Sequence, residues 1–283
     1  MHTLSTIQKI VTGRPTSDGA GVKLTRLIGG APLQDLDPFL LLDHFGSDDS
    51  ADYIGGFPDH PHRGFETVTY MLKGKMRHKD SVGNEGVIED GDIQWMTAGS
   101  GIIHSEMPEQ TEGEMSGFQL WVNLPRSDKM TPPKYQEYKA ADIPVEQREH
   151  GVHIKVIAGQ TKQGTEGVIK NDYVHPNYWD VNMPADNTLT DHLPVDHNAF
   201  IYVYDGMIEV DGEPLKAGEL AVLTAAETLQ VNSVEAARFL VVSGKPLNEP
   251  VARYGPFVMN TMDEINQALQ DFRDNKLTTN RST

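Results

Sequence analysis

Short strand-like segments, separated by turn residues, run along most of this chain. Residues 21–28 alternate apolar and polar side chains, and residues 66–72 are rich in β-branched and aromatic side chains. Turn-forming sequences such as Lys73-Gly74-Lys75 and Ala98-Gly99-Ser100-Gly101 separate these segments. Short strands spaced by roughly ten residues, with turns between them, predict an all-β sandwich or barrel.

The same layout occurs twice. In the first half, a strand over residues 66–72 is followed by a second strand that Gly91 opens. In the second half, residues 199–204 and Gly218 repeat this order. The chain of 283 residues is long enough for two domains, each with its own core. We therefore expect a duplicated β-barrel.

A polar, proline-containing segment at residues 125–138 separates the two strand series. We expect domains over residues 1–133 and 134–283. Thr261 begins a capping-box sequence, and apolar residues at helical spacing follow it. We therefore expect an α-helix over residues 261–275, at the end of the second domain.

Composition narrows the class of function. The chain carries 41 acidic and 24 basic residues and a net charge of -17, which opposes broad nucleic-acid binding. The absence of cysteine excludes disulfides, thiolate metal sites and a cysteine nucleophile. No run reaches the about 18 apolar residues of a membrane span, and the N-terminal segment has no secretory pattern. We expect a cytoplasmic protein.

Two pairs of metal-ligand residue types stand at alternate positions, His60 with His62 and His104 with Glu106. Side chains at alternate positions of a strand point to the same face, and Pro61 favours an extended His60. If the two strands pair, three imidazoles and one carboxylate converge. Such a set suits Fe(II), Mn(II), Ni(II), Co(II) or Cu(II), and Zn(II) less well.

Other interpretations of these residues exist. A single histidine is usually structural or solvent-exposed, and the ligand interpretation depends on the second pair following a glycine-rich turn. A structural protein with an adventitious metal is a further alternative, but buried histidines and carboxylates need partners.

Residues 55–66 (GGFPDHPHRGFE) resemble the first cupin motif, and residues 91–106 (GDIQWMTAGSGIIHSE) resemble the second. Within the cupins, FPDHPHRGFETVTY, the second string and the late GPFVMNT are similar to sequences of the pirin family. The resemblance covers nearly the whole chain. It implies a bicupin, in which two jelly-roll barrels face each other, with a C-terminal helix.

The resemblance also implies one metal ion, usually iron, in the N-terminal barrel. The matching ligands are His60, His62, His104 and Glu106. Glu66 stands where ordinary cupins have a ligand, and here it is either a residue beside the metal site, facing the substrate, or simply a buried hydrogen-bond acceptor.

The second half departs from the metal-binding pattern. His197 has no second histidine two positions later, and no His-x-Glu follows Gly218. The resemblance therefore implies a C-terminal barrel without metal, in which His175, His192 and His197 are not ligands.

Pirins resemble quercetinases, which implies ring cleavage of flavonols such as quercetin by O2, with release of carbon monoxide. Glu106 or Glu66 would take the proton of the substrate's 3-hydroxyl group. An aromatic substrate needs an apolar pocket wall. The candidates for this wall, each of which could instead be core, are Phe57, Met96, Ile103 and Met107.

A regulatory function is the alternative. A metal- or redox-sensing protein of the pirin type would use the same ligands to control a surface that meets a protein partner. An open path to the metal would favour the enzyme, and an enclosed metal would favour the sensor. In either case we expect a monomer, with no direct contact to nucleic acid or membrane.

Overall fold

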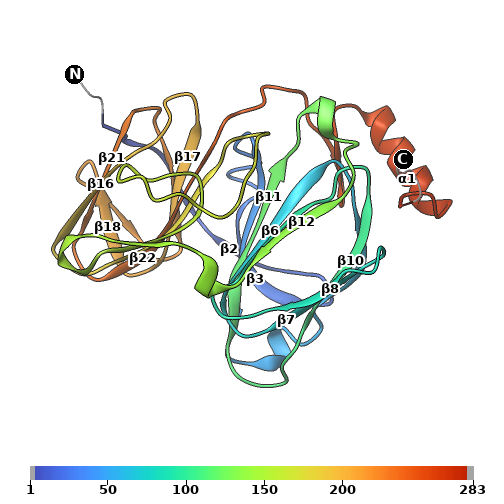
Figure 1. The fold of residues 1–283 in the computed structure, drawn as a ribbon, viewed down its shortest axis with the longest axis horizontal. Coiled ribbons are helices and arrows are strands. Elements are labelled where there is room, and N and C mark those ends of the chain that lie inside the picture. Colours follow the sequence, from blue (N-terminus) through green and yellow to red (C-terminus); the bar gives the residue numbers. More distant parts are fainter. Residues whose placement is uncertain (1–3, 279–283) are drawn as a thin grey trace. The chain divides into compact units, whose positions relative to one another are not determined.

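The computed structural model describes residues 4–278, which fold into two compact units built from antiparallel strands (Figure 1). The first barrel comprises residues 14–35, 39–140 and 247–278. The second barrel comprises residues 4–13, 36–38 and 141–246.

The first barrel contains two sheets, one of seven strands and one of four. The order of the large sheet is β12 (Lys134–Tyr138), β9 (Ile93–Thr97), β6 (Phe65–Lys73), β11 (Met115–Asn123), β4 (Phe39–Ser47), β3 (Val22–Ile28) and β2 (Arg14–Asp18). The order of the small sheet is β5 (Phe57–His62), β10 (Ile102–Pro108), β7 (Met76–Asp80) and β8 (Glu85–Ile88).

The second barrel has the same construction. The order of its large sheet is β1 (Ile7–Thr12), β20 (Glu219–Leu223), β17 (Asn198–Asp205), β22 (Ala237–Gly244), β15 (Asn177–Met183), β14 (His153–Ala158) and β13 (Val145–Gln147). The order of its small sheet is β16 (Asn187–His192), β21 (Thr228–Ser233), β18 (Met207–Val210) and β19 (Glu213–Lys216). Strands β6 and β17 hold the same place in the two large sheets, as do β9 and β20, so the predicted duplication is confirmed.

Short elements complete the chain. The 3-10 helices are η1 (Ser50–Asp52), η2 (Arg126–Asp128), η3 (Ala140–Asp142) and η4 (Glu149–Gly151). The last segment forms a hairpin of β23 (Ala252–Tyr254) and β24 (Phe257–Met259), followed by α1 (Met262–Arg273). None of the helices in the described residues is long and apolar enough to cross a membrane.

The interiors of the two barrels differ in chemistry. Alternate residues of the strands point inward. In the second barrel they form one large apolar cluster, to which Trp179, Leu229 and Phe239 belong. The first barrel has a smaller apolar cluster around Leu24 and Phe45 and also buries histidine, carboxylate and amide side chains.

The boundaries of the two units depart from the expected division at residues 133 and 134. Strand β1 pairs with β20, so the N-terminal strand belongs to the second barrel and covers an edge that would otherwise be unpaired. The C-terminal hairpin and α1 belong to the first barrel (Figure 1). There, Arg63 Nη1 lies 2.7 Å from Asp271 Oδ2 of α1.

Helix α1 begins as the sequence predicts. Thr261 Oγ1 accepts from the backbone N–H of Glu264, and Glu264 Oε2 accepts from the backbone N–H of Thr261. The apolar face buries Ile265 and Ala268 against Phe257.

Candidate metal centre

Three histidines converge inside the small sheet of the first barrel. His60 and His62 lie at the end of β5, and His104 lies in β10, directly opposite His60. The ring centroids are 4.6 Å apart for His60 and His62, 4.4 Å for His60 and His104, and 5.0 Å for His62 and His104. One ligand atom from each ring lies within 4.8 Å of the other two. This is the spacing that a single metal ion needs.

Burial disfavours the charged form of the two most buried rings. His62 is 2% exposed and His104 is 1% exposed. Burial, together with the neighbouring histidines, holds the pKa of each imidazole well below its usual value. A neutral imidazole has a free lone pair, so both rings are in the protonation state that binds metal.

Their nitrogen atoms are left for a ligand to satisfy. Both ring nitrogens of His104 and Nδ1 of His62 are buried without a hydrogen-bond partner. A buried polar atom without a hydrogen bond or a metal ion destabilises the folded state. His60 Nδ1 lies 2.9 Å from the Pro58 carbonyl, which directs Nε2 toward the other rings when Nδ1 carries the proton. The three side chains therefore fit a divalent metal with nitrogen ligands.

Glu106 lies two residues beyond His104 on the same inward face of β10, with a bulge between them in the pairing with β5. Thr69 Oγ1 donates to its Oε1 at 2.8 Å, and Gln119 Nε2 donates to its Oε2 at 3.1 Å. The close group of ligand atoms consists of the three histidines, and Glu106 lines the cavity beside them. Its role as fourth ligand stays a proposal.

Glu66 occupies a different environment. It is buried in β6 and accepts a hydrogen bond of 2.8 Å from Thr97 Oγ1. It does not line the cavity beside the histidines. This placement agrees with the simpler of the two expectations, a buried hydrogen-bond acceptor.

A cavity of about 500 Å³ opens onto two of the three histidines, His60 and His62. Its walls combine aromatic, apolar and charged side chains. The lining residues are Asp18, Gly19, Leu24, Arg26, Leu41, Asp43, Phe45, Phe57, Pro58, Asp59, His60, His62, Glu106, Gln119, Trp121, Arg253, Gly255 and Pro256.

Of the four residues expected in the pocket wall, Phe57 lines this cavity and the others do not. Met96 packs in the core with Ala98. Ile103 and Met107 alternate with His104 and Glu106 along β10, so they point away from the face that carries His104. Ile103 packs instead against the cluster that contains α1.

Sequence reasoning missed the charged wall of the cavity. Arg26 Nε donates to Asp43 Oδ1 at 2.8 Å, and Arg26 Nη2 donates to Asp43 Oδ2 at 2.7 Å. The guanidinium carbon of Arg253 lies 4.7 Å from the centroid of the Trp121 ring. The nearest sequence signal was the GPFVMNT string, which begins two residues after Arg253 but does not reveal which barrel it meets.

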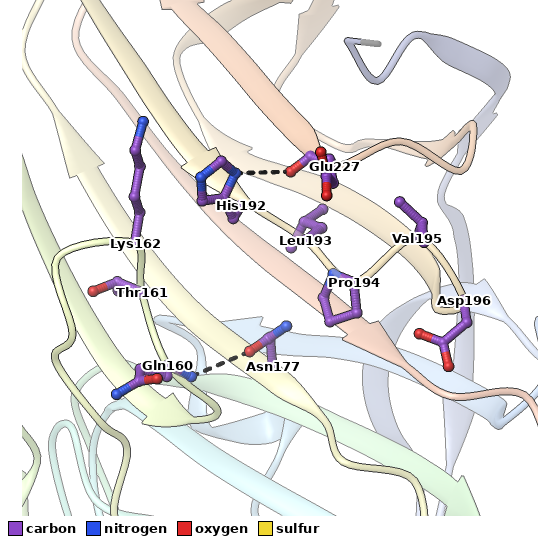
Figure 2. A pocket seen from close by; sticks show the side chains of 10 residues that line it. All are labelled: Gln160, Thr161, Lys162, Asn177, His192, Leu193, Pro194, Val195, Asp196 and Glu227. Carbon is purple, nitrogen blue, oxygen red and sulfur yellow. Dashed lines mark hydrogen bonds between the residues drawn. The ribbon is translucent and has the colours of Figure 1, made fainter. Parts of the chain in front are cut away.

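The second barrel has a larger cavity, of about 680 Å³, and Figure 2 shows the side chains that line it. His192 Nδ1 lies 3.0 Å from the Glu227 carbonyl oxygen, a contact drawn there as a dashed line. His197 Nδ1 pairs with Ser243 Oγ at 3.2 Å. Across the described residues, His60, His62 and His104 form the one close group of three or more such ligands. We therefore place the candidate centre by its chemistry and not by cavity size.

Comparisons with known proteins agree with this architecture. The Pirin family model matches residues 21–122, and the model of the Pirin C-terminal cupin domain matches residues 178–278. A pirin-like protein of Caulobacter vibrioides is 53% identical over 267 residues, which cover 94% of this chain and 97% of the relative. Human pirin is 41% identical over 275 residues, which cover 94% of this chain and 91% of the relative.

A solved structure extends the similarity. The crystal structure of a quercetin 2,3-dioxygenase from Acinetobacter baumannii superimposes with a TM-score of 0.89 at 37% sequence identity. The match covers 97% of this chain and 99% of that one. The similarity therefore includes both barrels.

Proposed function

The chain belongs to the pirin family, and from that premise we propose that it is a metal-dependent dioxygenase, most readily with iron, that cleaves flavonols such as quercetin with O2. One observation carries the proposal: a cavity of about 500 Å³ opens onto His60, His62 and Glu106. Ligand cavities of about 300–1,000 Å³, largely apolar with a few convergent polar groups, are typical of small-molecule sites.

His60, His62 and His104 would hold the metal, and Glu106 would complete the set. A bound Fe(II) would polarise the oxygen atoms of the substrate and supply redox chemistry with O2. The chain itself contributes neutral imidazoles, held in place on two paired strands before any ligand arrives.

Glu106 is the proposed base for the 3-hydroxyl proton of the flavonol. Glu106 lines the cavity, and Thr69 and Gln119 donate hydrogen bonds to its two carboxylate oxygens. A base must lie within hydrogen-bonding reach of the proton that it takes, and Glu106, unlike Glu66, lines the cavity.

The walls suit a flat aromatic molecule. Phe45, Phe57 and Trp121 line the cavity, and Leu24 and Leu41 add apolar surface. These side chains would hold the rings of a small aromatic substrate and keep water from the reacting atoms.

A metal- or redox-sensing function is the alternative. It would require no cavity beside the histidines, because a sensor needs only the metal and a responsive surface. The cavity next to His60 and His62 is the observation that favours the enzyme.

Oxygen uptake tests the proposal. The Fe(II)-loaded protein is given quercetin, and oxygen consumption and carbon monoxide are measured, with His62→Ala and His197→Ala as the matched variants. We expect uptake and carbon monoxide from the parent and His197→Ala, and neither from His62→Ala. Absence of uptake by a parent protein that demonstrably holds iron would overturn the proposal.

A further inference from the structure

We propose that Arg253 determines the specificity of this cavity, by selecting aromatic substrates that carry an anionic group. The inference rests on the proposed function, because it assigns the class of substrate to the same site. Arg253 comes from the C-terminal segment, more than 140 residues after the last histidine of the cluster, so no motif around the histidines includes it.

The hairpin of β23 and β24 fixes the position of Arg253. Within the hairpin, Arg253 pairs with Val258. The Val258 N–H donates to the Arg63 carbonyl at 3.0 Å, and Arg63 also forms a bridge with Phe257. Since Arg63 follows His62 directly, the hairpin lies along the end of the histidine strand. Arg253 and Pro256 consequently form part of the cavity wall.

Arg253 is held in place by neutral groups. Its guanidinium carbon lies 4.7 Å from the centroid of the Trp121 ring, and its Nη1 donates to the Leu40 carbonyl at 3.2 Å. The Trp121 ring lies 5.4 Å from the His62 ring, centroid to centroid. Trp121 therefore contacts both Arg253 and His62, so a substrate that meets the histidines also lies within reach of the cation.

The two arginines of the cavity differ in their acidic partners. Arg26, the other arginine of the cavity, pairs with both Asp43 and Asp18. Within residues 4–278, no acidic side chain forms a direct ion pair with Arg253. Burial and the nearby Arg26 lower its pKa, and the charges of Asp43 and Asp18 act in the opposite direction. Asp59, also on the cavity wall, and Arg253 are both exposed to water, so solvent screens the field of each.

A planar guanidinium with free N–H donors, seated on an aromatic wall, matches a carboxylate, sulfonate or phenolate oxygen of an aromatic ligand. A neutral flavonol would fill the same space without this contact. The selected class is thus an anionic aromatic compound that also carries a hydroxyl and carbonyl pair.

The test measures binding apart from turnover. The full chain is loaded with redox-inert zinc, and calorimetry gives the Kd of quercetin and of a sulfonated quercetin. The variants are Arg253→Met, Arg253→Lys and the control Arg238→Met. Arg238 lies over the Tyr204 ring at 4.9 Å in the second barrel, so it is matched in type of contact.

We expect Arg253→Met to raise the Kd of the sulfonated quercetin by about tenfold and the Kd of quercetin by less than about threefold. Arg253→Lys should recover part of the preference, and Arg238→Met should leave it unchanged. An equal loss of affinity for both ligands, or no loss for either, would overturn the inference. The zinc content of each variant confirms that it keeps its metal site.

The two proposals can fail separately. If the iron-loaded parent consumes no oxygen but the zinc-loaded protein shows the Arg253-dependent preference, the dioxygenase function fails and the specificity stands. If oxygen uptake occurs but the preference is independent of Arg253, the specificity fails and the dioxygenase function stands.

Discussion

At the scale of single residues, Gly64 allows the histidine strand and the C-terminal hairpin to approach each other. Its φ is +89°, and a Cβ atom there would lie 1.9 Å from the Val258 carbonyl oxygen. Gly83 has a similar φ of +97° but nothing within 4 Å of its Cβ position. A comparison of alanine substitutions at the two glycines therefore distinguishes the cost of a left-handed φ from the cost of a steric clash.

We expect Gly64→Ala to lower the free energy of unfolding by at least about 3 kcal/mol, and Gly83→Ala by about 1 kcal/mol. Only the first variant combines a left-handed φ with a clash against backbone. Urea denaturation of the two variants measures the difference, and equal costs would show that the contact with Val258 is unimportant.

His44, in β4, gives the first barrel a dependence on pH. Burial lowers the pKa of its imidazole to about 4 from 6.5. The unfolded chain therefore binds a proton at a higher pH than the folded one, so acidification through the interval from 6.5 to 4 favours unfolding.

Between neutral pH and about pH 4, we expect the parent to lose more stability than His44→Gln, by on the order of 2 kcal/mol. Denaturation curves at several pH values measure this difference. Identical pH profiles for the two proteins would contradict the assignment to His44.

Alternation along a strand explains what could be predicted at this scale. It predicted that His60, His62 and His104 share one face, and the structure brings them together. The same rule, applied to Ile103 and Met107, places them on the opposite face, outside the cavity. Arg253 could not be found in this way, because its position depends on a contact distant in sequence.

At the scale of elements, Lys129 connects three segments of the first barrel. Its buried ammonium donates to the carbonyl oxygens of Gly64 at 2.8 Å and Val258 at 3.1 Å, and to Asn123 Oδ1 at 2.7 Å. Burial lowers its pKa to about 8. The histidine strand and the hairpin that carries Arg253 thus share one donor.

Lys129→Met would leave these three acceptors unpaired, and we expect it to cost about 3 kcal/mol of stability. We also expect faster amide hydrogen exchange in residues 252–259, since the hairpin loses its anchor. Lys170→Met is the matched control, because Lys170 forms an exposed pair with Glu166 and should change stability by less than about 1 kcal/mol. Unchanged exchange in the hairpin of Lys129→Met would contradict this role.

Elements with local signals were predictable, and their long-range partners were not. The capping box at Thr261 fixed the start of α1, and glycine turns marked the strands around Gly74 and Gly206. The pairing of β1 with β20 joins opposite ends of the chain, and no local pattern encodes it. The assignment of α1 to the first barrel escaped prediction for the same reason.

At the scale of the whole molecule, one strand order supports two different interiors. Strand β21 holds in the second barrel the place that β10 holds in the first. It buries Leu229 and Val231, whereas β10 buries His104 and Glu106. The fold is therefore common to both halves, and the candidate chemistry resides in the side chains of one.

Metal content tests the central claim, that His60, His62 and His104 form the metal centre. The parent, His104→Ala and His197→Ala are loaded with Fe(II), dialysed and analysed for bound metal. We expect about one ion per chain in the parent and in His197→Ala, and almost none in His104→Ala. Equal metal content in all three proteins would contradict the claim.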